Sequence, residues 1–548
     1  MHRLTLAKNS NRTQRTIILL SPSTADPFGA LVAGAKTKLR VRTKHIRFFA
    51  LPTGAEITDS ATLLHTLGSS ANATVLVSSG EDYIGASAAA PPTSTTPIVH
   101  LAKSTYADPL SEAQLSAAAQ LPGILLAVGQ PDLHAGSKFP IGAAFVSDAW
   151  LHPPLIGSDI GCGMSWYRLT LPRAALAGKG ACERIAETLR GLEGAWMTSR
   201  ERSAWLGVEN SSGVEKFDAA LGTIGAGNHF AEIQTVEEGA ELAGAEVLLL
   251  VHSGSRGLGG DVLGRFYSPQ EEEGKSGQIS IADEPERAKE YLALHDEACQ
   301  WAHANRDLIA LRFLQKLEPG GAWSCDSGTT IEDIAALRRK LRERKWVDIH
   351  HNNVVKTLWP PQGENEAPEP QKEVFIHRKG AAPTDAGHPL LPLPGSRGTP
   401  TLILKPLFTA ANGFGGNHAL SAAHGAGRSM SRTKASEKFR NRYDEASGAR
   451  KKGDTSGEKR KKGDRGHNDG DFLAGGGGGG GGRKGKSTTK GDDEDGGWVV
   501  CEDKELVWEE APEAYKDVES VAKDLVDAGV AEIVGRCVPR VTYKLRKE

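Results

Sequence analysis

A glycine-rich, charged tract at residues 432–497 is the feature that most constrains how this chain can fold. It contains a run of eight glycines at 475–482 and is dense in Lys, Arg, Asp and Glu, with few large apolar residues. Such a sequence cannot bury enough apolar surface to offset the entropy lost on ordering. We therefore predict that the tract is disordered, with basic clusters that could contact RNA weakly.

Patterned sequence resumes after this tract. Residues 499–507 are typical of a strand, residues 513–528 have helical spacing of apolar positions, and residues 538–545 predict a short closing strand. The tract is therefore predicted to be an insertion within a domain rather than a tail.

The first 85 residues have a different pattern. We expect strands at 16–20 and 74–78, helices at 27–39 and 60–67, and a hairpin at 46–54. This order resembles a β-grasp domain of the doublecortin or ubiquitin-like kind. The resemblance implies a module that binds a partner, joined to the rest by a linker at 86–96 that is rich in Ala, Ser, Thr and Pro.

Length and composition exclude several classes of protein. A chain of 548 residues exceeds what one hydrophobic core usually organises, so we expect two or more units. Six scattered cysteines do not form a disulfide framework, and no apolar run approaches the roughly 20 residues that cross a bilayer. We expect a cytoplasmic or nuclear protein without membrane association. The formal charge of −2 means that any nucleic-acid role depends on a local site.

From residue 97 onward, strand-like runs and helical segments are mixed without a regular period. The strand-like runs cover 124–128, 143–146, 247–252, 374–377 and 401–405, and the long helical patterns cover 285–315 and 331–345. This arrangement favours an α+β fold, with one large irregular mixed domain at 97–548, over a Rossmann sheet or a TIM barrel.

Seven short segments of this domain carry His, Asp or Cys, and all of them except 350–353 contain glycine. Glycine lets the backbone approach a ligand closely, and the other three residue types bind divalent metals. A single histidine of this kind is as often a structural residue, but seven such segments predict a shared polar centre. They cover residues 129–136, 157–164, 221–232, 252–257, 350–353, 377–380 and 424–428.

These segments resemble the RtcB family of GTP-dependent RNA ligases, known from transfer-RNA splicing and RNA repair. The resemblance rests on Asp-Ile-Gly-Cys-Gly-Met at 159–164, Gly-Asn-His-Phe at 227–230, His-Ser-Gly-Ser-Arg-Gly at 252–257 and His-Gly-Ala-Gly-Arg at 424–428. It runs from about residue 99 to the C terminus, apart from the insertion. The sequences at 129–134, 220–225 and 394–399 resemble the branch of the family linked in bacteria to a release-factor homologue more than the main splicing branch.

The resemblance implies a centre of two manganese ions that share the Cys162 thiolate. Asp159 and His229 would complete the ligand shell of one ion, and His252 and His351 that of the other. A thiolate between two cations is reasonable because each positive charge lowers the thiol pKa. The donor set suits Mn²⁺ or Zn²⁺, so it does not by itself choose manganese.

The resemblance also implies that His424 is the nucleophile. It would attack the α-phosphate of GTP, and the resulting GMP-histidine would activate an RNA 3′-phosphate or 2′,3′-cyclic phosphate end for joining to a 5′-hydroxyl end. Arg428 would offer a fork for phosphate oxygens. The chain continues for four residues beyond Lys544, where the family commonly ends in Lys-Gly. The GTP-binding residues implied are Asn228, Glu232, Pro394, Gly395, Ser396, Arg397, Gly425, Ala426, Gly427, Arg428 and Lys544.

Two alternatives remain open from the sequence. A metal-dependent 2′,3′-cyclic phosphodiesterase or 3′-end-processing enzyme would keep only the hydrolytic part of this chemistry. A non-catalytic RNA-binding scaffold would use none of it, and its protein partner would be set by residues 1–85.

Overall fold

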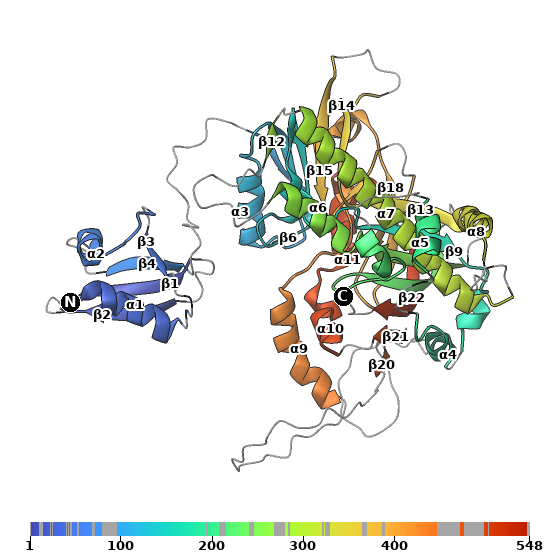
Figure 1. Ribbon diagram of the computed structural model, residues 1–548, viewed down its shortest axis with the longest axis horizontal. Helices are drawn as coiled ribbons and strands as arrows, with labels where there is room; N and C mark the ends of the chain where they lie inside the picture. Colours follow the sequence, from blue (N-terminus) through green and yellow to red (C-terminus); the bar gives the residue numbers. More distant parts are fainter. Residues whose placement is uncertain are drawn as a thin grey trace, which may run out of the picture. The chain divides into compact units, whose positions relative to one another are not determined.

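The computed structural model divides into two compact units, Met1–Thr95 and Thr96–Glu548 (Figure 1). No helix among the described residues is both long and apolar enough to cross a membrane. The structure describes residues 2–544 except for 10–14, 22–23, 25, 40, 42, 44–45, 52–53, 68–71, 79–95, 179, 193–195, 197, 208–214, 240–245, 268–279, 283–284, 321–322, 324–328, 364–369, 386–388, 447–471, 476–497 and 502–503.

The N-terminal unit is a four-stranded sheet with two helices. The strand order is β2-β1-β4-β3, in which β1 runs parallel to β4 and antiparallel to β2. The predicted strands and helices are confirmed to within about two residues, while β1 had not been foreseen. The assignment to the β-grasp family stays a prediction, and the proposed linker lies almost wholly outside the described residues. The elements are β1 His2–Lys8, β2 Arg15–Leu20, α1 Pro27–Lys38, β3 Arg47–Ala50, α2 Ser60–Leu67 and β4 Asn72–Ser78.

The larger unit is α+β, as predicted, and is built on two main sheets. The nine-stranded sheet has the order β13-β9-β11-β10-β22-β18-β17, with β21 also paired to β22 and β20 to β21, and the five-stranded sheet has the order β14-β15-β7-β6-β5. Their strands are β5 Ile98–His100, β6 Ile124–His134, β7 Ile141–Ser147, β9 Gly163–Arg168, β10 Phe230–Glu238, β11 Val247–Ser253, β13 Lys345–His350, β14 Asn352–Trp359, β15 Lys372–Lys379, β17 Leu391–Pro394, β18 Thr401–Pro406, β20 Phe472–Gly475, β21 Trp498–Cys501 and β22 Ala531–Lys544.

Two small ribbons and the helices complete this unit. The ribbons pair β8 with β12 and β16 with β19. The elements are β8 Trp150–Leu151, β12 Ile281–Ala282, β16 Ala381–Pro383, β19 Ser421–Ala423, α3 Pro109–Ala118, α4 Ala181–Thr188, α5 Ser199–Leu206, α6 Gly257–Phe266, α7 Pro285–Leu317, α8 Ile331–Arg344, α9 Arg432–Ala446, α10 Lys504–Glu509 and α11 Val518–Asp527, with short 3₁₀ turns between them.

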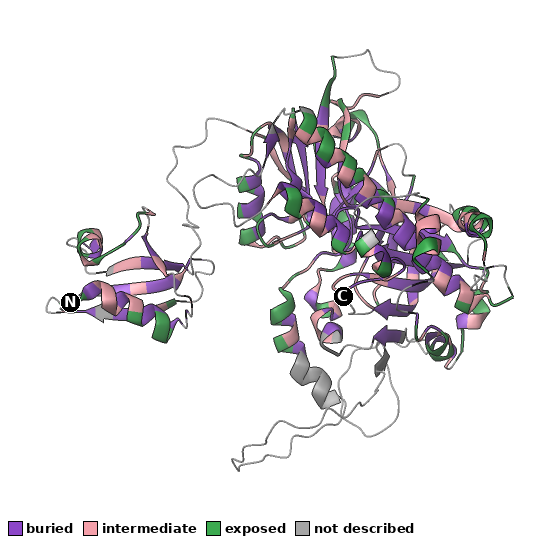
Figure 2. Ribbon diagram, viewed as in Figure 1, coloured by how far each residue is buried: buried purple, intermediate pink, exposed green. Residues whose placement is uncertain are grey.

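Strand β11 is buried along its whole length. Figure 2 shows that most strand residues of the larger unit are buried. Successive side chains of a strand point to opposite faces. Leu249 and Val251 enter the core that contains α7, whereas Leu248 and Leu250 enter the core shared with the five-stranded sheet. A continuous apolar run is therefore required here, because both faces of the strand are covered.

The predicted disorder from residue 432 onward is wrong at its start. Residues 432–446 form α9, whose Ala435 and Phe439 pack against Ala511 and Ala514 beyond the insertion. Ala435 and Phe439 are four residues apart, so they give the helix a narrow apolar stripe that composition alone did not reveal. Residues 472–475 form β20, and residues 447–471 and 476–497, where the rest of that prediction falls, lie outside the described residues.

The segment after the insertion also differs from its prediction. The strand expected at 499–507 ends at Cys501, and α10 follows. Leu506 of that helix packs against Val499 and Cys501, so apolar residues expected along one strand instead meet across a strand and a helix. The helix expected at 513–528 begins at Val518, and the closing strand β22 is longer than predicted.

Candidate metal centre and nucleotide pocket

The five predicted metal ligands lie at one end of the nine-stranded sheet. Asp159 and Cys162 precede β9, His229 precedes β10, His252 is near the end of β11 and His351 follows β13. Strand β11 runs antiparallel to β9 and β10, and β13 runs antiparallel to β9. The ends of β11 and β13 therefore meet the starts of β9 and β10, which brings ligands from distant parts of the sequence together.

The ligand atoms of these residues converge on the Cys162 sulfur. Its Sγ lies 3.2 Å from Nε2 of His229, 3.4 Å from Nε2 of His252 and 3.3 Å from Nε2 of His351. Asp159 Oδ2 lies 3.0 Å from His229 Nε2. The atoms form two groups of three, Asp159 with Cys162 and His229, and Cys162 with His252 and His351, and each group could hold one cation.

The environment of these side chains fits bound cations. His229 Nδ1 lies 3.1 Å from the Ile224 carbonyl oxygen, so donation of its proton there leaves the Nε2 lone pair free for a metal. Burial lowers the pKa of His252 and of His351 well below the usual value, which keeps both rings neutral. Burial and the Asp159 carboxylate raise the pKa of the Cys162 thiol, and an adjacent divalent cation would oppose that rise.

A buried arginine fixes the backbone around the centre. The Arg306 guanidinium donates to the carbonyl oxygen of Gly161 at 2.9 Å and to that of Ser253 at 3.0 Å. These carbonyls adjoin the ligands Cys162 and His252. Arg306 itself is held by Asp348, at 2.7 Å, so one ion pair positions two ligand-bearing segments.

His424 lies beside the metal ligands and is oriented by a second carboxylate. Its Nδ1 is 2.7 Å from Oδ2 of Asp132, a residue of β6 with a fully buried side chain. Its ring centroid lies 4.6 Å from that of His351. The loop after His424 reaches Asp132 closely: Gly427 has φ +70°, and a Cβ there would lie 2.3 Å from the Asp132 carbonyl oxygen. Donation from Nδ1 to Asp132 leaves the Nε2 lone pair of His424 available.

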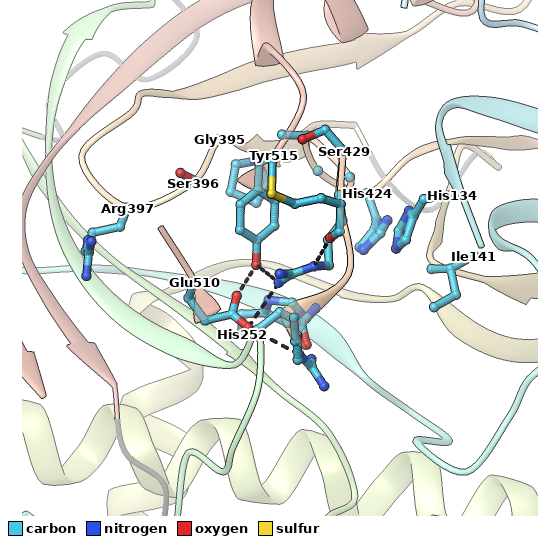
Figure 3. Close-up of a pocket in the computed structure, with 18 of the residues that line it drawn as sticks. His134, Ile141, His252, Gly395, Ser396, Arg397, His424, Ser429, Glu510 and Tyr515 are labelled. Carbon is cyan, nitrogen blue, oxygen red and sulfur yellow. Dashed lines mark hydrogen bonds and ion pairs between the residues drawn. The ribbon is translucent and has the colours of Figure 1, made fainter. Parts of the chain in front are cut away.

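His424 opens onto a cavity of about 740 Å³, within the range of small-molecule sites. Figure 3 shows His424 and His134 side by side at one part of the cavity, with Arg397 at another. All the residues predicted to bind GTP line this cavity: Asn228, Glu232, Pro394, Gly395, Ser396, Arg397, Gly425, Ala426, Gly427, Arg428 and Lys544.

Glu232 and Lys544 are among the ionisable side chains buried in this cavity. Glu232 of β10 accepts hydrogen bonds from Thr542 at 2.5 Å and from Gln234 at 2.9 Å, and burial raises its pKa to about 7. Lys544, at the end of β22, donates to the Gly227 carbonyl oxygen at 3.3 Å, and burial lowers its pKa. Strand β22 thus places Lys544 near Glu232 of the neighbouring strand β10.

Arg428, predicted to offer its fork to phosphate oxygens, is hydrogen-bonded within the protein. Its guanidinium donates to Glu510 and to the Tyr515 hydroxyl, each at 3.2 Å, and to the backbone carbonyl oxygens of Glu509 and Met430. These bonds use four of the five N–H donors of Arg428, so a contact with two phosphate oxygens would require at least one of them to break.

Asp132, Glu510, Tyr515 and His134 were not among the predicted site residues. Asp132 and His134 stand within the glycine-containing segment 129–136, and that segment was the sequence feature that could have identified both as site residues. Glu510 and Tyr515 stand beyond the insertion, where no local motif marks them. The Glu510 carboxylate lies 3.2 Å from Arg428, 3.3 Å from Arg432 and 3.9 Å from Lys544, and these cations contribute to its lowered pKa.

The cluster of metal-type ligands at one end of the nine-stranded sheet, beside the buried His424, agrees with the family to which the chain belongs. A family described as "tRNA-splicing ligase RtcB" matches residues 114–210, 208–464 and 483–545. The chain therefore belongs to the RtcB family of RNA-splicing ligases.

Curated relatives support the same assignment. The chain is 32% identical to RNA-splicing ligase RtcB2 of Escherichia coli over 80% of its own length and 93% of that protein. It is 27% identical to the tRNA-splicing ligase RtcB of Thermococcus kodakarensis over 78% of its length and 89% of that protein. It is also 27% identical to RNA-splicing ligase RtcB of Escherichia coli K12, over 63% and 85%.

Proposed function

We propose that this RtcB-family protein joins RNA ends that carry a 3′-phosphate or 2′,3′-cyclic phosphate to ends that carry a 5′-hydroxyl. GTP would supply the energy through a GMP-histidine at His424, and two Mn²⁺ ions would occupy the centre around Cys162. The observation that carries this proposal is His424 between Asp132 and the ligand His351, at the wall of the large cavity.

The first step would form the covalent intermediate. Asp132 holds the Nδ1 proton of His424, so Nε2 can attack the α-phosphorus of GTP. A P–N bond forms as the bond between the α-phosphorus and the bridging oxygen breaks, and pyrophosphate leaves with that electron pair. His424 then carries GMP, and Asp132 stabilises the positive charge that develops on the imidazole during the attack.

Asp159, Cys162, His229, His252 and His351 would hold the metal ions. When bound, the ions would neutralise negative charge on the reacting phosphate. The donors are of the nitrogen, sulfur and oxygen types that Mn²⁺ and Zn²⁺ accept. The protein contributes the geometry, because the Arg306 guanidinium anchors backbone on both sides of the centre.

The later steps would transfer GMP and then release it. Where the RNA arrives with a 2′,3′-cyclic phosphate, water first attacks its phosphorus and the bond to the 2′ oxygen breaks, which gives a 3′-phosphate and a 2′-hydroxyl. An oxygen of the 3′-phosphate then attacks the phosphorus on His424, and the P–N bond breaks, which frees the imidazole and leaves an RNA end bearing GMP. The 5′-hydroxyl of the second RNA attacks the 3′-phosphorus, loses its proton and displaces GMP. Glu232 and Lys544 would hold the guanosine, since they supply a hydrogen-bond acceptor and a donor in the buried part of the cavity.

A ligation assay tests this proposal against the hydrolytic alternative. The substrates are an end-labelled RNA with a 2′,3′-cyclic phosphate and a second RNA with a 5′-hydroxyl, with Mn²⁺ and with or without GTP. GTP-dependent joining supports the ligase. Opening of the cyclic phosphate with no joined product at any GTP concentration would instead identify a cyclic phosphodiesterase.

A further inference from the structure

Charge is distributed unevenly between the two units. The N-terminal unit, residues 1–95, contains ten Lys and Arg but five Asp and Glu, a formal charge of +5, whereas the rest of the chain carries −7. No group of metal-type ligands falls among the described residues of this N-terminal unit. The excess of cations therefore belongs to the N-terminal unit, while the predicted reaction centre lies in the larger one.

Four of these cations lie at one end of the N-terminal sheet. Lys8 ends β1 and Arg15 begins the antiparallel neighbour β2, so these two residues share that end. Helix α1 follows β2 and returns along it, and Lys38 Nζ near its C terminus donates to the Ile17 carbonyl oxygen at 2.9 Å. Lys36 lies in the same last turn. We call Lys8, Arg15, Lys36 and Lys38 the basic end.

The acidic side chains that the structure describes in this unit do not neutralise the basic end. Among the described residues, none of its four cations has an acidic partner, and Glu56 pairs with Arg47 at 2.8 Å. Asp26 caps the start of α1 through the Gly29 amide, and Ser60 beside Asp59 donates to Asp26. Because α1 has 12 residues, its start lies about 18 Å from the basic end.

Exposure and composition indicate the chemistry of the ligand. Arg15, Lys36 and Lys38 are exposed, and Lys8 is partly exposed. Protein interfaces depend on buried aromatic or large apolar anchors, whereas Lys and Arg supply most of the affinity for backbone phosphates. Among the described residues of the unit, the large apolar side chains that are exposed are Ile17 and Leu64, which do not form such an anchor cluster. The surface therefore fits a polyanion better than a protein.

We propose that the basic end of the N-terminal unit binds the phosphate backbone of single-stranded RNA, away from the reacting ends. The proposal rests on the proposed function, which makes RNA the substrate. A basic unit tethered to a catalytic unit would raise the local concentration of RNA without taking part in bond formation.

The test removes three of these charges in the full-length protein. The variant Arg15→Gln/Lys36→Gln/Lys38→Gln is compared with the parent for binding of a single-stranded RNA by fluorescence anisotropy from 0.05 to 0.5 M salt. Each lost phosphate contact reduces the slope of log K against log salt by about 0.7, so three contacts reduce it by about 2. If the contacts contribute nothing at about 1 M salt, affinity at about 0.1 M should fall about 100-fold.

Two matched variants make the result specific. Arg15→Lys/Lys36→Arg/Lys38→Arg keeps the charges and should bind RNA like the parent. Arg184→Gln/Lys289→Gln/Lys356→Gln removes three exposed cations from the larger unit and should leave the salt slope unchanged. An unchanged RNA affinity and salt slope in Arg15→Gln/Lys36→Gln/Lys38→Gln overturns the proposal. The basic end would then be assigned to binding a protein partner.

A separate readout keeps this test apart from the proposed function. Labelling of His424 by GTP without RNA should be the same in all three variants and the parent. Failure of labelling in the parent would refute the proposed chemistry, while the salt dependence of RNA binding would still decide the role of the basic end.

Discussion

Replacing Asp132 by Asn should nearly abolish guanylylation while leaving GTP binding intact. The Asp132 carboxylate can only accept, so it fixes the His424 proton on Nδ1 across 2.7 Å. An Asn amide can present its NH₂ group to the same atom, which favours the tautomer with the proton on Nε2 and removes the attacking lone pair. The equivalent loss of tautomer control in a Ser-His-Asp triad costs about 10⁴-fold, so we expect a fall of 10³- to 10⁴-fold in single-turnover labelling.

The assay follows covalent GMP on the protein after rapid mixing with GTP and Mn²⁺, and GTP affinity is measured separately by calorimetry. Affinity should change less than about threefold, because Asp132 lies behind His424 and not among the cavity-lining residues. The matched control is Asp148→Asn, which removes an exposed carboxylate paired with Lys372 and should label at the parental rate. A loss below tenfold in Asp132→Asn, with both proteins folded, would refute the role given to this carboxylate.

Three further predictions follow from particular contacts. Arg306→Lys should weaken Mn²⁺ binding about 10- to 100-fold by calorimetry, because Lys cannot reach both backbone carbonyls and Asp348 at once, and parental metal affinity would contradict its positioning role. Hydrogen bonds from residues 103–105 lower the pKa of Asp524, so the stability it contributes is fully present above its unfolded pKa near 3.8 and is lost only as pH falls through the lowered folded-state value. Asp524→Asn should therefore lower the thermal midpoint at pH 7, and a large part of that deficit should remain at pH 3; a deficit that disappears by pH 3.8 would count against this. Replacing residues 447–471 with a short Gly/Ser linker should preserve labelling of His424, since loop closure changes by only about 0.6 kcal/mol per doubling of length, and truncation at Gly497 should destroy it because β22 is lost.

Much of the site could be predicted because the residues that carry its chemistry stand in short local motifs. Cys162, His229 and His252 each have a glycine within two positions, and His351 stands in the segment His-His-Asn-Asn at 350–353. The structure brings all four together at one end of the sheet. What the motifs could not show is how the strands pair. The antiparallel register that puts the end of β11 against the start of β9 depends on contacts between residues about 90 positions apart.

The contacts that single segments could not reveal are those made across the insertion. Glu510 pairs with Arg428 where Phe439 of α9 packs against Ala511, which lies just beyond α10. The early end of β21 at Cys501 has the same cause, since Leu506 packs back on it from a helix. Tertiary packing decided the structure where local propensity was weak.

The most direct test of the account is covalent labelling of His424. The protein is incubated with Mn²⁺ and GTP radiolabelled at the α-phosphate, without RNA, and the labelled residue is located by mass spectrometry. The account predicts an acid-labile GMP adduct on His424, released when RNA with a 3′-phosphate is added, and no adduct in His424→Ala. Absence of any adduct in the Mn²⁺-loaded parent, or an adduct that persists in His424→Ala, would contradict it.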